Sequence, residues 1–77
     1  MTNGHLRWQC RRGMKELDQL LVRYLETYYD PSSAEEKSAF EAFLTLSDPE
    51  LIAYLLKGER SDSDVTNEII DRILGRH

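Results

Sequence analysis

The sequence contains little cysteine, proline or glycine, with one Cys, two Pro and four Gly among its 77 residues. Because Cys10 is the single cysteine, no internal disulfide can form, and a lone thiol is typical of a reducing compartment. The two histidines, His5 and His77, lie at opposite ends of the chain, so no Cys/His group has the spacing of metal ligands. We therefore expect a protein without a metal site.

Long apolar runs are also missing. No segment approaches the roughly 20 apolar residues that a membrane-spanning helix needs. The first residues lack the apolar stretch of a secretion signal. These absences predict a cytoplasmic protein with no membrane partner.

Acidic side chains are absent from the first fifteen positions, which carry four basic residues. The remaining positions carry six basic and all fourteen acidic residues, and the net charge of the chain is −4. Nucleic-acid affinity comes largely from Lys and Arg that neutralise phosphates, so this acidic balance argues against a nucleic-acid partner. The small basic segment suits an acidic patch on a partner protein.

The alternation of apolar and polar residues that marks strands is absent, and apolar residues recur with the 3.6-residue period of helices. We expect an all-α fold, a compact five-helix bundle in which residues 1–77 form a single helical domain. The predicted helices run from about His5 to Arg12, from Met14 to about Tyr28, from a start at Ser32 or Ser33, from Asp48 to Gly58, and from Ser61 or Ser63 to Gly75.

Serine, proline and glycine predict the helix ends. Either Ser32 or Ser33 has a glutamate three positions on, the spacing of a capping box. Asp48 is expected to cap the fourth helix, with Pro49 as its first helical residue, where a missing N–H costs nothing. Glycine, which tolerates the left-handed conformation common after helices, follows three of them, at Gly13, Gly58 and Gly75.

The predicted core is thin, because a chain of this length buries only about 60% of the surface that its unfolded form exposes. Such a core leaves little room for a ligand pocket of roughly 300–1,000 Å³, so a shallow surface site is expected. The residues predicted to face inward are Leu6, Cys10, Met14, Leu17, Leu20, Leu21, Tyr24, Leu25, Tyr28, Ala39, Phe40, Phe43, Leu44, Leu51, Ile52, Leu55, Leu56, Val65, Ile69, Ile70, Ile73 and Leu74.

Residue sets that carry catalysis are not found. No Ser/His/Asp or Cys/His group is evident, and Glu16 and Asp18 are two apart on a helix, where side chains do not face each other. The glycine-rich fingerprint that binds dinucleotides after a strand is absent from the sequence. The tyrosines at 24, 28 and 29 have helical spacing, which favours core packing over flavin stacking. We expect no catalytic residue and no enzyme activity.

The residue types at the junction between the first two predicted helices are the ones least explained by core packing, helix capping or solvent exposure. Gly13 either simply makes the turn or also lets a partner's backbone approach closely. With Gly13 as N-cap, Glu16 would occupy the third helical position, where the helix dipole favours a carboxylate. An exposed Arg12–Glu16 pair would be worth about 0–1 kcal/mol, so a requirement for both residues would indicate partner contact.

Trp8, the single tryptophan, has two readings. It either caps the core or anchors an interface, since Trp and Arg are frequent in binding hot spots. In a helix that continues to Arg12, Arg7 and Arg11 would share one face, and Trp8 and Arg12 another. The nearby arginines favour the interface reading.

Three stretches of the sequence together match a known family. They are Leu6–Asp18, which includes Arg12-Gly13-x-x-Glu16; Ser33–Lys37 followed by Phe40 and Leu44; and Ser47–Leu51 followed by Leu55 and Gly58. In this order and in a chain of this length, the set resembles the small bacterial flavinylation (FAD assembly) factors for succinate dehydrogenase. The resemblance covers roughly residues 5–75.

The resemblance implies an assembly factor that binds the flavoprotein subunit of succinate dehydrogenase or of fumarate reductase. Such a factor promotes covalent attachment of FAD to a histidine of that subunit, and FAD is handled by the client instead of being bound firmly. A cofactor-binding residue is not assigned. The expected partner-binding residues are Arg7, Trp8, Arg11, Arg12, Gly13, Met14, Lys15 and Glu16.

Two other functions are compatible with a chain of this size. One is an antitoxin-type regulatory partner, which would require a toxin. The other is a small helical nucleic-acid-binding module that uses Arg7, Arg11 and Arg12, and which the acidic balance disfavours. A gel-shift assay at physiological salt separates that module from the assembly factor.

Overall fold

The computed structural model describes residues 4–76, and within them the chain forms five α-helices and no strand. The predicted all-α five-helix fold is confirmed. The helices are α1 (Gly4–Gln9), α2 (Lys15–Tyr24), α3 (Ala34–Phe43), α4 (Asp48–Leu55) and α5 (Asp64–Ile73), and a π-helical segment, η1 (Leu25–Tyr29), continues α2.

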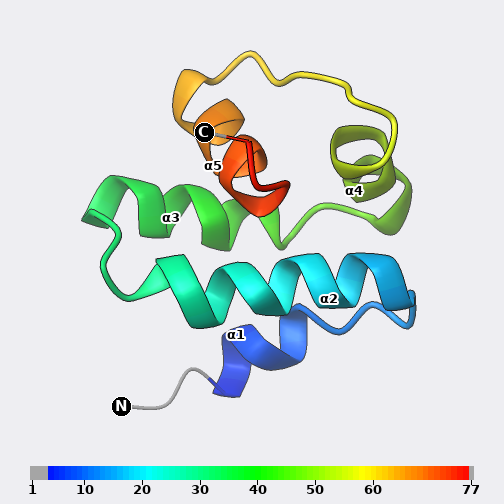
Figure 1. The fold of residues 1–77 in the computed structure, drawn as a ribbon, viewed down its shortest axis with the longest axis horizontal. Coiled ribbons are helices and arrows are strands. Elements are labelled where there is room, and N and C mark those ends of the chain that lie inside the picture. Colours follow the sequence, from blue (N-terminus) through cyan, green and yellow to red (C-terminus); the bar gives the residue numbers. More distant parts are fainter. Residues whose placement is uncertain (1–3, 77) are drawn as a thin grey trace.

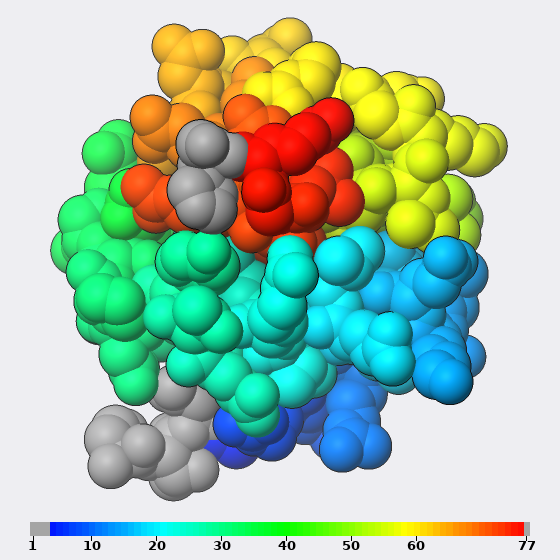
Figure 2. Space-filling view, in the orientation of Figure 1, coloured from blue at the N-terminus to red at the C-terminus, as the bar shows by residue number. Residues whose placement is uncertain are grey.

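The helices are arranged around α2, which crosses the middle of the molecule (Figure 1). α5 packs on both α3 and α2, and α4 packs on α2 and α5. α1 lies below α2 in Figure 1, opposite α4 and α5. The space-filling view shows α1 as a small blue ridge at the lower edge, with the light-blue start of α2 on the surface beside the yellow segment that follows α4 (Figure 2).

The core lies where α2, η1, α3, α4 and α5 meet. Its centre is aromatic: the rings of Tyr24 and Phe40 have centroids 4.6 Å apart, and Tyr29 packs on Phe40 at 5.9 Å. The buried residues are Cys10, Leu17, Leu21, Tyr24, Leu25, Tyr29, Phe40, Phe43, Leu44, Leu51, Leu55, Ile69, Ile70 and Ile73. Most of the predicted inward residues are therefore in the core, and the others, apart from Leu56 and Val65, are partly buried against it.

Leu56 is an error in the predicted core. It was expected on the inner face of the fourth helix, but its side chain is 42% exposed. α4 ends at Leu55, and Leu56 is its C-cap residue with φ −110°. The buried stripe of α4 is made by Leu51 and Leu55, whereas Leu56, whose N–H still donates to the carbonyl of Ile52, lies beside that stripe on the exposed side.

The tyrosines at the end of α2 show the effect of the π-helical segment. A π-helix places the hydrogen-bonded residue five positions away instead of four. Tyr29, five after Tyr24, is consequently buried, whereas the predicted core residue Tyr28 is only partly buried. The ring of Tyr28 still lies 5.5 Å from that of Tyr24, so the tyrosines serve packing, as expected.

Two helix starts differ in how well the sequence predicted them. Ser33 caps α3, and its capping box with Glu36 is complete. The predicted cap of α4 is wrong by one residue: Ser47, not Asp48, is the N-cap, and Pro49 is the second helical residue. The reciprocal bonds between Ser47 and Glu50 form a second capping box, which satisfies two backbone N–H groups at once.

The first helix is shorter than predicted, ending at Gln9 instead of Arg12. Residues 10–14 form a link to α2 that is not helical. Among the described residues, no helix is both long enough and apolar enough to cross a membrane.

Candidate partner-binding site

The link between α1 and α2 alternates between buried and exposed residues. Cys10 is fully buried, Arg11 is exposed, Arg12 is mostly buried, Gly13 is exposed and Met14 packs partly against the core. Alternation with a period of two is the pattern of an extended chain, not of a helix. Arg11 and Arg12, both expected among the partner-binding residues, therefore point in opposite directions.

Arg12 points inward, which corrects the expectation of an exposed side chain. Its side chain is 17% exposed, and Nη2 donates to the carbonyl oxygens of Leu44 at 3.0 Å and Leu46 at 2.5 Å. Its Nε lies 3.3 Å from a carboxylate oxygen of Asp48, an ion pair without hydrogen-bond geometry. Arg12 thus joins the link to the corner between α3 and α4.

The backbone of the link is fixed to α2 as well. The N–H of Arg12 donates to Oδ1 of Asp18 at 2.6 Å. Asp18 is on the first turn of α2, so its side chain ties the link to the helix that follows. The Arg12–Glu16 pair that the spacing allowed is not formed, and Arg12 contacts Asp18 and Asp48 instead.

Gly13 has φ +81°, the left-handed conformation that was predicted for it. A Cβ atom built there would meet no heavy atom of the described chain within 4 Å. The space above Gly13 is therefore open, which a partner's backbone can use. Gly13 is not the helix cap, however: Met14 is the N-cap of α2, and Glu16 is its second helical residue instead of the third.

The remaining candidate residues are mainly on the surface. Trp8 is 72% exposed, so it does not cap the core. Arg7 donates from Nη1 to a carboxylate oxygen of Glu26 at 2.7 Å, a pair between half-exposed side chains. Lys15 and Glu16 are exposed on the first turn of α2. The structure thus presents Arg11, Gly13, Lys15 and Glu16 on one continuous segment, with Trp8 on the preceding helix.

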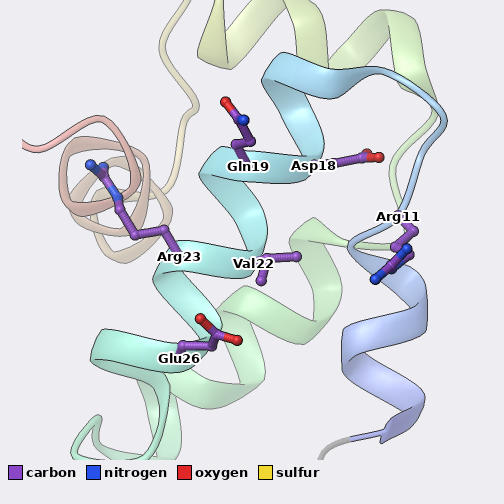
Figure 3. A pocket seen from close by; sticks show the side chains of 6 residues that line it. All are labelled: Arg11, Asp18, Gln19, Val22, Arg23 and Glu26. Atoms are coloured by element: carbon purple, nitrogen blue, oxygen red, sulfur yellow. The ribbon is translucent and has the colours of Figure 1, made fainter.

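Two open hollows flank the exposed side of α2. The first has a volume of about 430 Å³ and lies between the link and the helix (Figure 3). It is lined by Arg11, Asp18, Gln19, Val22, Arg23 and Glu26. The second, of about 370 Å³, is lined by Glu16, Gln19, Leu20, Arg23 and Leu56. Both are surface features with charged walls, in accord with the expected shallow site.

The thiol of Cys10 lies buried at the start of the link. Burial raises the pKa of the Cys10 thiol to about 11, against the opposing effect of the nearby Arg7 and Arg12, so this cysteine is a poor nucleophile at neutral pH. Residues 4–76 contain no group of three or more His, Cys, Asp or Glu side chains that could hold a metal ion.

Sequence reasoning missed Asp18 and Asp48 as parts of this site. Asp18 was considered only as a poor catalytic partner of Glu16, and Asp48 only as a helix cap. Their common role is to fix residue 12, and a contact between residues 12 and 48 leaves no periodic signal in the sequence.

The comparisons with known proteins agree with the resemblance. Residues 4–77 match the family model described as flavinator of succinate dehydrogenase. The FAD assembly factor SdhE of Colwellia psychrerythraea is 37% identical over 99% of this chain and 84% of its own length. The corresponding factor of Idiomarina loihiensis is 38% identical over 92% and 79%, and that of Yersinia pseudotuberculosis 43% over 83% and 74%. No solved structure gives a significant match.

Proposed function

The chain belongs to the family of flavinators of succinate dehydrogenase, and on that basis we propose that it binds the flavoprotein subunit of succinate dehydrogenase or of fumarate reductase. There it promotes the covalent attachment of FAD. The main support for the position of the docking surface is Gly13. Its backbone is left-handed and exposed, and no heavy atom of the described residues beyond its two chain neighbours lies within 4 Å of where a Cβ would be. Gly58 is equally open, between Lys57 and Glu59, but only Gly13 lies within the Arg-Gly-x-x-Glu motif of the resemblance.

The exposed residues of the junction have complementary roles in this docking. Gly13 lets the flavoprotein approach the backbone closely. Glu16 accepts hydrogen bonds, and Arg11 and Lys15 meet acidic or carbonyl groups. Trp8 supplies apolar contact area, which exposed tryptophans at interfaces commonly do.

Arg7 and Met14 take supporting positions in this surface. Arg7 is tied to η1 by its ion pair with Glu26, and Met14 packs against the core directly after Gly13. Both lie at the edge of the exposed segment, so their contribution to binding is smaller than that of Gly13 and Glu16.

The factor acts without catalysing the chemistry itself. It stabilises the conformer of the flavoprotein in which FAD and the acceptor histidine are aligned, by binding that conformer more tightly than the others. FAD stays with the flavoprotein throughout. We place this activity in the bacterial cytoplasm.

The test uses purified apo-flavoprotein, FAD and the Glu16→Ala variant. We expect covalent flavinylation to fall towards the rate without the factor. Glu35→Ala is the matched control, because Glu35 is also an exposed glutamate at the second position of a helix, α3. Normal stimulation by folded Glu16→Ala would show that the site assignment is wrong. Failure of the wild-type chain to bind the flavoprotein would reject the function itself.

A further inference from the structure

Arg12 belongs to the Arg-Gly-x-x-Glu motif, yet its side chain is turned away from the surface that the motif presents. Only 17% of the side chain is exposed. Its guanidinium is already occupied by two carbonyl oxygens, of Leu44 and Leu46, and by the carboxylate of Asp48. A partner could reach these donors only by displacing contacts that hold the chain together.

The place where Arg12 binds explains why an arginine suits it. Leu44 is the C-cap of α3, and Asp48 is the first residue of α4. The carboxyl end of a helix carries partial negative charge on its free carbonyl groups, which favours a cation. A planar guanidinium can serve two carbonyls and a carboxylate at once, whereas the single ammonium of lysine cannot match that geometry.

The contacts of residue 12 determine the position of its neighbours. The side chain fixes the link to the α3–α4 corner, and the N–H fixes it to Asp18 on α2. Gly13 follows immediately and begins the exposed segment that ends with Glu16. The ion pair of Arg7 with Glu26 also tethers α1, but it is half-exposed, and such pairs contribute little.

Given that Gly13 and Glu16 dock on the flavoprotein, as proposed above, we infer that Arg12 is a positioning residue that makes no contact with the flavoprotein. It holds residues 13–16 in the conformation that binds. Asp48, outside the motif, shares this role through Arg12. Apparent affinity falls in proportion to the fraction of molecules in the binding-competent conformer, so loosening the link weakens binding without changing the chemistry of the surface.

The experiment measures flavinylation against factor concentration for Arg12→Gln, Arg12→Lys and Asp48→Asn at a temperature where each is folded. We expect the half-saturating concentration to rise about tenfold for both Arg12 variants and less for Asp48→Asn, with an unchanged rate at saturation. Amide hydrogen exchange of residues 11–16 rises in the same order, because the link opens more often. Arg76→Gln is the matched control, since Arg76 is an exposed arginine outside the proposed surface, and its loss should leave both the half-saturating concentration and the exchange of residues 11–16 unchanged.

Two results would overturn the positioning role. In the first, Arg12→Gln exchanges faster in the link but binds the flavoprotein normally. In the second, Arg12→Gln binds weakly with normal exchange, while Asp48→Asn, which frees the guanidinium, binds as well as or better than the wild type; Arg12 would then contact the flavoprotein directly. Absence of stimulation by the wild-type chain would instead reject the proposed function.

Discussion

The amino end of α2 is constructed differently from those of α3, α4 and α5. The last three helices each begin with a serine, Ser33, Ser47 and Ser63, whose side chain accepts a hydrogen bond from the backbone N–H three positions on. α2 begins with Met14, whose side chain has no oxygen to offer. The start of α2 is the part that follows Gly13 and carries Glu16.

The difference separates local from tertiary control of structure. A serine cap contributes about 0.5–2 kcal/mol through residues adjacent in sequence. The start of α2 depends instead on Arg12, which reaches to residues 44–48, and on the packing of Met14. Natural chains tend to break local rules where they carry function. The comparison therefore supports the proposal that the junction binds the partner, while the capped helices stabilise the fold.

The largest effect on stability is expected in the core beneath the capped helices. Phe40 on α3 is fully buried and contacts the rings of Tyr24 and Tyr29. Phe40→Ala should lower the free energy of unfolding by about 3–5 kcal/mol, as measured by urea unfolding followed by circular dichroism. Leu56→Ala is the control. Because the side chain of Leu56 is 42% exposed, its truncation should lower the free energy of unfolding much less. Equal losses for the two variants would contradict the core described above.

The second effect separates stability from binding at Gly13. An L-residue in the left-handed conformation costs about 1–2 kcal/mol, so Gly13→Ala should lower stability by that amount. Flavinylation should fall more than this loss explains, by about tenfold or more at a fixed factor concentration, because the added methyl group meets the flavoprotein.

Gly58→Ala provides a closely matched control for this prediction. Gly58 has φ +79°, and a Cβ there would also meet no atom within 4 Å. The backbone strain is therefore the same, but Gly58 lies after α4, outside the proposed surface. If both variants reduced flavinylation equally, stability alone would account for the effect of Gly13→Ala, and the comparison between the two regions would fail.

The same comparison explains which parts of the structure the sequence predicts. The cap at Ser33 with Glu36 was predicted because the partners are three residues apart. The left-handed glycines were predicted because the requirement is local to each residue. The predicted start of α4 was wrong by one residue because the sequence holds two start signals there. Ser47 with Glu50 has the spacing of a capping box, and Asp48 with Pro49 that of a cap followed by a first helical proline. The structure uses the capping box.

The errors at the junction and in the tyrosine region have long-range causes. The predicted helical spacing of Leu6 and Cys10 is kept, since the N–H of Cys10 donates to the carbonyl of Leu6, but the chain leaves the helix after Cys10, and this lets Arg12 reach the α3–α4 corner. The π-helical segment places Tyr29 in the core instead of Tyr28, and there Tyr29 packs against Phe40 from a distant part of the sequence. Neither choice is determined by neighbours in sequence, so periodicity could not predict the direction of the Arg12 side chain.

A smaller effect is expected from removing a cap. Ser33→Ala should lower the free energy of unfolding by about 1 kcal/mol, because the N–H of Glu36 loses its acceptor. Flavinylation at equal concentrations of folded protein should not change. Ser38→Ala is the control, since Ser38 is exposed within α3, where alanine is the better helix former. A loss of flavinylation in Ser33→Ala would show that the capped region also contributes to binding.

The smallest effect is the pH dependence of the α3 cap. The backbone N–H of Ser33, and then the guanidinium of Arg72, hold the pKa of the Glu36 carboxyl below its ordinary value of 4.5. A lowered pKa in the folded state stabilises the fold above the unfolded pKa, and this contribution is lost as the pH falls through the folded pKa. As the pH falls below about 4.5, protonation of Glu36 should therefore lower the free energy of unfolding of the wild type.

Glu36→Gln isolates that contribution, because glutamine keeps an oxygen for the capping box but does not titrate. The wild type should exceed the variant in urea midpoint at pH 7, and the gap should narrow as the pH falls below the ordinary glutamate pKa of 4.5 and through the lower pKa of the folded state. In an Arg72→Gln background the gap should be narrower from the start, since the Ser33 N–H is then the main remaining partner of the carboxylate. A gap that stays constant with pH would mean that Glu36 acts by geometry alone, and the capped start of α3 would then owe its stability to hydrogen bonding without a charge contribution.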